Sequence, residues 1–130
     1  MQLIPPDLHA PLLRNGAARD ADPVPVLKLF NPCGAATWLI TEVRTDEPDL
    51  LFGLCDLGLG CPELGYVSLA ELESVKGPFG LGIERDLHFA GRFPLSVYAE
   101  AARVAGHITE SVPSLRQAAD ALARRRESAS

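Results

Sequence analysis

The chain has 130 residues, of which 47% are hydrophobic and 22% charged, values typical of a soluble protein with one packed domain. The net charge is −5 at pH 7, which argues against sequence-independent nucleic-acid binding, because that binding needs many lysine and arginine contacts to phosphates. No apolar stretch approaches the roughly 20 residues of a membrane span. The N-terminus resembles no secretory signal, and three cysteines are an odd number for a disulfide framework, so we expect a cytoplasmic protein without membrane contact.

The first half of the chain predicts one helix followed by three strands. Residues 5–16 carry prolines in the first helical turn and an apolar face, which indicates a short helix. Alternating and β-branched apolar residues predict strands at 24–30, 37–44 and 50–57. Gly53 within the third of these indicates a bulge or a close approach of another backbone segment.

The next stretch combines two strands with an inserted helix. Residues 64–68 form a predicted strand, and Ser68 with Glu71 makes a capping box for a helix at 69–75. The glycine-rich segment 77–82 runs from helix into strand, the reverse of a phosphate-binding loop, so we interpret it as a turn. Strict alternation then predicts a fifth strand at 83–89.

Two helices complete the chain. The first covers residues 95–105 and ends at a glycine. The second follows Pro113, with Ser114 and Gln117 as its capping box. Its apolar stripe favours packing on the sheet, although docking to a partner or to a second copy of the chain remains open.

The order of these elements predicts an α+β fold. The loops between strands are too short for parallel crossovers, so about five strands should form a small antiparallel sheet. The inserted helix and the N- and C-terminal helices should pack on that sheet. We expect a single domain at residues 1–126 and a flexible tail at 127–130.

Several blocks of sequence occur in an order that resembles a known family. The blocks are LKLFNP at 27–32, TWLITE at 37–42, FGLCD at 52–56, ELGYVSLAELESV at 63–75, GPFGLGIERDLHF at 77–89 and PLSVYAEA at 94–101. Together they resemble domain of unknown function 2958, a family of small bacterial proteins often encoded on plasmids and integrative elements. The resemblance covers residues 3 to 110 and implies a cytoplasmic accessory protein of a mobile element. It implies no catalytic residues.

The strongest candidates for catalysis are Glu84, Asp86 and His88. On a strand at 83–89 these three side chains would project from one face. They could bind a divalent metal, with Asp56 and Glu63 as further ligands, or act as general acid and base. The competing interpretation is the ordinary polar face of a half-buried strand, and we assign no metal site.

Arg85 would lie on the apolar face of the same strand, where a charge needs a partner. It could pair with a carboxylate such as Glu73, or it could bind an anionic ligand. Trp38 and Tyr66 lie on predicted strands and could bind a partner, although core packing is the default for aromatic residues. With Asp56, these residues are the candidate binding positions.

Two functional hypotheses follow from these patterns. No catalytic or cofactor-binding motif is complete, so the first is an accessory protein that binds another protein or a nucleic-acid-processing complex. The second is a small metal-dependent or acid/base hydrolase that uses Glu84, Asp86 and His88. We predict no cofactor, and a homodimer through the C-terminal helices is an open option.

Overall fold

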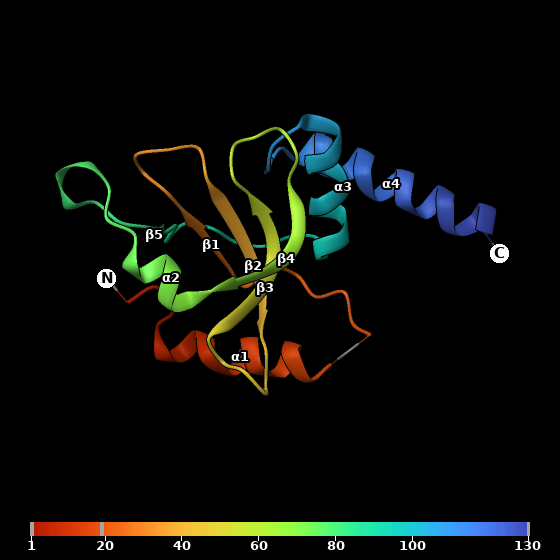
Figure 1. Cartoon of the computed structure of the whole chain (residues 1–130). Helices are drawn as coiled ribbons and strands as arrows, with labels where there is room; N and C mark the ends of the chain where they lie inside the picture. Colours follow the sequence, from red (N-terminus) through yellow and green to blue (C-terminus); the bar gives the residue numbers. More distant parts are fainter. Residues whose placement is uncertain (1, 19, 130) are drawn as a thin grey trace.

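The computed structural model describes residues 2–18 and 20–129. Five strands form one sheet, with helices packed on both of its faces (Figure 1). The strands are β1 (Leu27–Phe30), β2 (Thr37–Val43), β3 (Leu50–Asp56), β4 (Glu63–Ser68) and β5 (Glu84–Arg85). The helices are α1 (Pro6–Ala17), α2 (Leu69–Ser74), the 3-10 turn η1 (Pro78–Gly80), α3 (Leu95–Ala105) and α4 (Val112–Ala129).

The sheet is antiparallel throughout, in the order β4-β3-β2-β1-β5. The four strands from β1 to β4 form a meander because each connection between them is a short turn. The chain then passes through α2 and η1 and returns beside β1 as the edge strand β5. This architecture confirms the predicted α+β class.

Each face of the sheet has its own hydrophobic core, because successive strand residues point to opposite sides. The first core joins Ile40 of β2 to Leu12 of α1, and both are fully buried. The second core joins Leu39 of β2 and Leu54 of β3 to Ala102 of α3. The sheet is therefore the middle of three layers (Figure 1).

Two glycines let backbone segments approach closely. A Cβ on Gly53 would lie 1.9 Å from the carbonyl oxygen of Leu39, beside a register shift between Ile40 and Glu42 of β2. A Cβ on Gly16 would lie 2.1 Å from the carbonyl oxygen of Val43, so α1 can rest directly on β2 only because this residue is glycine. The close approach predicted at Gly53 is confirmed.

The predicted strand at 83–89 is wrong in length, because β5 contains only Glu84 and Arg85. The Asp86 carboxylate accepts a hydrogen bond from the backbone N–H of His88 at 2.9 Å. A hydrogen bond from a backbone N–H to the side chain of an aspartate two residues earlier favours a turn over a strand. Glu84, Asp86 and His88 therefore do not project from one strand face. Similarly, β1 begins at Leu27 rather than residue 24 because Pro25 cannot donate a ladder hydrogen bond.

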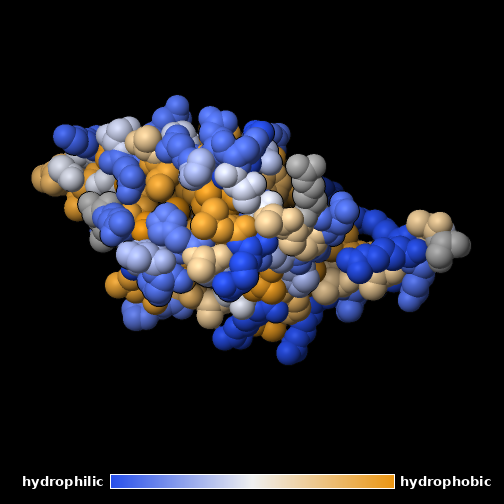
Figure 2. Space-filling view, turned by 90° about the horizontal axis from the view of Figure 1, so that it is seen from below, coloured by the Kyte–Doolittle hydropathy of each residue, from blue (hydrophilic) through white to orange (hydrophobic). Residues whose placement is uncertain are grey.

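The last helix begins one turn earlier than its sequence pattern indicates. Ser111, and not Ser114, caps α4, since the Ser111 hydroxyl accepts the N–H of Ser114 at 3.5 Å. The helix continues to Ala129 and so includes most of the expected tail, while Ser130 lies outside the described residues. Its C-terminal half projects beyond the sheet, and the projecting end is mainly hydrophilic when viewed from the α1 side (Figure 2).

Candidate functional site

A cavity of about 520 Å³ lies where β1 and β5 meet the turn between β1 and β2. It is lined by Lys28, Phe30, Asn31, Gly34, Ala36, Thr37, Arg85, Asp86, Leu87 and His88. The cavity thus contains Asp86 and His88, two of the predicted catalytic residues, and Arg85, a predicted binding residue. Glu84 is half-buried on β5 and does not line it.

Asp86 is held by two partners on the wall of this cavity. Its carboxylate accepts the N–H of His88, and the Nζ atom of Lys28 lies 3.5 Å away. The hydrogen bond from His88, together with the charge of Lys28, lowers the pKa of the Asp86 carboxyl below its ordinary value. The carboxylate is therefore stabilised in its charged form, which makes it a weak general base.

Lys28 connects this wall to the segment that precedes α4. Its Nζ atom donates to Glu110 at 2.6 Å, across 82 residues of sequence. Burial disfavours the charged lysine, but the hydrogen bond and the charge of Glu110, with those of Asp86, outweigh it and raise the pKa of Lys28. Neither Lys28 nor Glu110 was among the candidate residues, because their proximity depends on how the chain folds.

Arg85, unlike Asp86 and Lys28, has no ion-pair partner in the part of the chain that the structure describes. Within residues 2–18 and 20–129, its guanidinium forms no ion pair or hydrogen bond. The predicted pairing with Glu73 is wrong, since the Glu73 carboxylate accepts the backbone N–H of Leu3 at 3.3 Å. Arg85 is half-buried and also lines an adjoining cavity of about 330 Å³ beside α1. Asp7 and Asp86 line these cavities with it, but within the described residues neither carboxylate forms an ion pair with its guanidinium.

The other candidate binding residues lie elsewhere and have structural partners. Trp38 is 6% exposed and packs in the first core. Asp56 is also buried, and its carboxylate accepts the N–H groups of Gly58 at 2.8 Å and Ile108 at 2.9 Å. It ties the end of β3 to the segment before α4. Neither side chain offers a surface to a ligand.

Tyr66 remains accessible on the edge strand β4. The residue is 54% exposed, and its ring packs edge-on against Phe52 with a centroid separation of 5.0 Å. The guanidinium carbon of Arg44 lies 5.7 Å from its centroid. Tyr66 and the Arg85 cavity lie on opposite edges of the sheet, so the sheet does not bring them together (Figure 1).

No three histidine, cysteine, aspartate or glutamate residues in the described part of the chain are grouped so that they could hold a metal ion. Glu63 and Asp56, which we considered as additional ligands, do not line the cavity that contains Asp86 and His88. Of the cysteines, Cys33 and Cys61 are exposed, whereas burial raises the pKa of the Cys55 thiol. Among the residues that line the cavity, Arg85 is a cation without an ion-pair partner in the described part of the chain.

Comparison with known proteins gives one match. A model of the family DUF2958, described as protein of unknown function, matches residues 3–109, which excludes α4. No curated protein and no solved structure matches the chain. Among the described residues, no helix is both long and apolar enough to span a membrane. Because the family model covers most of the sequence, this chain belongs to the DUF2958 family.

Proposed function

We propose that this protein acts by binding, and that its cavity at β1 and β5 receives an acidic segment of a partner protein. The observation that carries this proposal is Arg85, which is half-buried and whose guanidinium has no partner among residues 2–18 and 20–129. Partial burial of a charge costs free energy unless a partner compensates for it. A carboxylate supplies that compensation well, because it can accept two parallel hydrogen bonds from one guanidinium.

The charge around the cavity supports an anionic ligand. Its lining contains two cations, Lys28 and Arg85; Lys28 is paired with Glu110 and Asp86, so Arg85 is the cation that is left to contact a ligand. The whole chain carries a net charge of −5. A local positive site on an acidic protein favours one or a few carboxylates over the extended phosphate backbone of a nucleic acid.

The shape of the site supports a segment of protein as the ligand. The main cavity and the adjoining one share Arg85, Asp86 and Leu87. Leu87 is 72% exposed between them and offers an apolar contact beside the charge. An acidic residue flanked by apolar side chains would complement both features.

The hydrolase hypothesis has less support from the same geometry. Asp86 is hydrogen-bonded and ion-paired, and Glu84 lies outside the cavity that contains His88. Binding also agrees with the accessory role on a mobile element that the family resemblance implies, and that role remains part of the proposal.

Two measurements test the proposal. In NMR titrations with a short blocked oligoglutamate peptide, the resonance of the Arg85 side-chain N–H and those of the cavity backbone should shift and saturate. Arg85→Gln should abolish the shifts of the cavity backbone, whereas Arg116→Gln, which removes an equal charge from the exposed surface of α4, should retain them.

Affinity capture from the host with the same three proteins then asks whether a natural partner uses this site. Wild type and Arg116→Gln should retain a common set of proteins that Arg85→Gln loses. If Arg85→Gln binds the peptide and retains those partners as wild type does, the proposal is refuted.

A further inference from the structure

Three cavities follow one another along the chain that leaves β5. The two cavities at β1 and β5 share Arg85, and His88 lines both the larger of them and a third cavity of about 310 Å³. The chain after β5 crosses the molecule to reach α3, so the row of cavities extends from Arg85 towards that helix (Figure 1). The third cavity is lined by His88, Ala90, Arg92, Tyr98, Glu110, Val112 and Leu115.

A second arginine borders the third cavity. Arg92 is exposed, and its guanidinium forms no ion pair or hydrogen bond with any residue of 2–18 or 20–129. A guanidinium is always charged in proteins, and its planar set of donors matches a carboxylate. The row therefore offers two separate cations to an anionic ligand, Arg85 in the cavities at β5 and Arg92 in the third cavity.

Tyr98 adds a buried donor to the third cavity. It lies on α3, is 2% exposed and packs edge-on against Phe93, with a centroid separation of 6.5 Å. Its hydroxyl oxygen accepts the backbone N–H of Arg92 at 3.1 Å, which holds the main chain of the arginine beside the phenol. The hydroxyl hydrogen has no acceptor in the part of the chain that the structure describes. Buried tyrosine hydroxyls usually have such a partner, and an oxygen atom of a ligand in the cavity would supply it.

The carboxylates along the row do not occupy these cations. Glu110 and Asp86 are both held by Lys28, whose Nζ atom lies 2.6 Å from the first and 3.5 Å from the second. Asp7 lies in the first turn of α1, where the helix dipole favours its charge, and of the three cavities it lines only the one beside α1. An anionic ligand would therefore break no described ion pair when it contacts an arginine of the row.

We propose that the acidic segment received at Arg85 carries a second acidic residue, whose carboxylate binds Arg92 and the hydroxyl of Tyr98. This inference rests on the proposed function and specifies its ligand, a segment with two acidic side chains joined by a short spacer that passes His88. The second carboxylate would accept hydrogen bonds from the guanidinium and from the phenol, and bonds to a charged acceptor are stronger than neutral ones. The apolar lining of the third cavity would contact the hydrocarbon part of the same residue.

NMR titrations with blocked peptides test this arrangement. One peptide contains a single glutamate, and a series of peptides contains two glutamates separated by glycine spacers of increasing length, in which each residue adds at most about 3.5 Å. At one spacing the wild-type affinity should exceed that for the single-glutamate peptide by about tenfold, because the tether raises the effective concentration of the second carboxylate. The backbone resonances of Arg92 and Val112 should shift with that peptide and not with the single-glutamate peptide.

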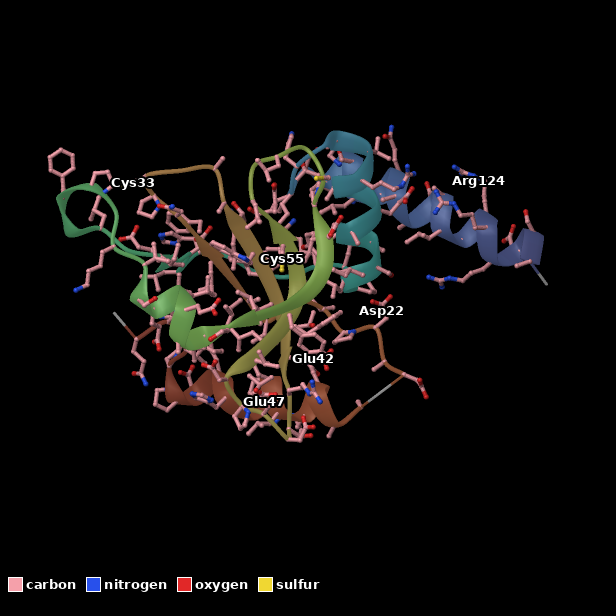
Figure 3. The ribbon with its side chains drawn as sticks, in the orientation of Figure 1. Asp22, Cys33, Glu42, Glu47, Cys55 and Arg124 are labelled. Carbon is pink, nitrogen blue, oxygen red and sulfur yellow. The ribbon has the colours of Figure 1, made fainter. Side chains whose placement is uncertain are left out.

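Three variants locate the second carboxylate. Arg92→Gln removes the exposed cation, and Tyr98→Phe removes only the hydroxyl. Each should lower the affinity for the best two-glutamate peptide and leave that for the single-glutamate peptide unchanged. Arg124→Gln removes an equal charge from the projecting end of α4 and should bind both peptides as wild type does (Figure 3). Thermal melting checks that Tyr98→Phe, which also removes the acceptor of the Arg92 N–H, remains folded.

The results separate this inference from the proposed function. If the single-glutamate peptide binds through Arg85 but no two-glutamate peptide binds more tightly, the second site is refuted and the proposed function stands. The second site is also refuted if Arg92→Gln binds the best two-glutamate peptide as wild type does. If neither kind of peptide binds, the proposed function and the second site are both overturned.

Discussion

Glu100 offers the sharpest test of how α4 is attached to the domain. Its carboxylate is 7% exposed and receives hydrogen bonds from two arginines, Arg103 at 2.8 Å within α3 and Arg125 at 2.7 Å from α4. Hydrogen bonds and charge from these two residues lower its pKa to about 2. Because α4 lies outside the part of the chain matched by the family model, the contact between Arg125 and Glu100 joins the additional helix to the family domain, while Arg103 reinforces it from within α3.

The size of the stabilisation follows from that pKa. A folded value of about 2 against an ordinary 4.5 corresponds to an upper limit of about 3 kcal/mol at neutral pH. Arg103 and Arg125 have side chains 65% and 57% exposed, so solvent screens part of the attraction. We therefore expect Glu100→Gln to lower the free energy of unfolding by about 1–2 kcal/mol at pH 7.

The lowered pKa of Glu100 also determines how the stabilisation changes with pH. A carboxyl whose pKa is lower in the folded state stabilises the fold above its unfolded pKa, here 4.5. That stabilisation should disappear as the pH falls towards about 2. Urea unfolding of wild type and Glu100→Gln at a series of pH values should thus give curves that converge in acid. Glu63→Gln, at an exposed carboxylate on β4, serves as the control and should show no such difference. Parallel curves for wild type and Glu100→Gln would refute the reasoning.

Three further predictions concern the core and the thiols. Asp56→Ala should lower the free energy of unfolding by about 2–3 kcal/mol in urea titrations, because it leaves the N–H groups of Gly58 and Ile108 without their acceptor; a loss below about 0.5 kcal/mol would contradict this role. Gly53→Ala should destabilise the protein by more than about 2 kcal/mol, since its Cβ would lie 1.9 Å from the Leu39 oxygen; an unchanged melting temperature would show that β2 and β3 can separate at little cost. A maleimide should label Cys33 and Cys61 rapidly and Cys55 slowly, because only Cys55 is half-buried with a raised pKa; mass spectrometry of the labelled peptides would detect equal rates, which would contradict the burial of Cys55.

Local patterns in the sequence were sufficient to predict most of the elements. The helix expected at 95–105 is α3 with the same bounds, and the capping bond at the start of α2 forms, with the N–H of Glu71 donating to Ser68 at 3.2 Å. Apolar alternation placed β2 and β3 to within a residue at either end. These features depend on neighbours a few residues apart, so the sequence carries them directly.

The exception is the strand expected at 83–89. The alternation of polar and apolar residues continues along this stretch, but the hydrogen-bonded pairing of strands does not. The Asp86 side chain bonds to the backbone of His88 and turns the chain after Arg85. Alternation of polar and apolar residues indicates an apolar face. It does not show whether a backbone group forms a hydrogen bond to a neighbouring strand or to a nearby side chain. Without the strand, the predicted row of Glu84, Asp86 and His88 does not exist.

The neighbours of each candidate site residue could be identified only from the tertiary structure. Sequence alone identified Arg85 as a charge that needs a partner, but only the fold showed that Glu73 is bonded to Leu3 and that no described residue forms an ion pair with the guanidinium. Lys28 and Glu110 meet across 82 residues, and Asp56 and Ile108 across 52. Long-range contacts of this kind are set by the packing of the sheet between its helices, because only that packing determines which distant side chains become neighbours.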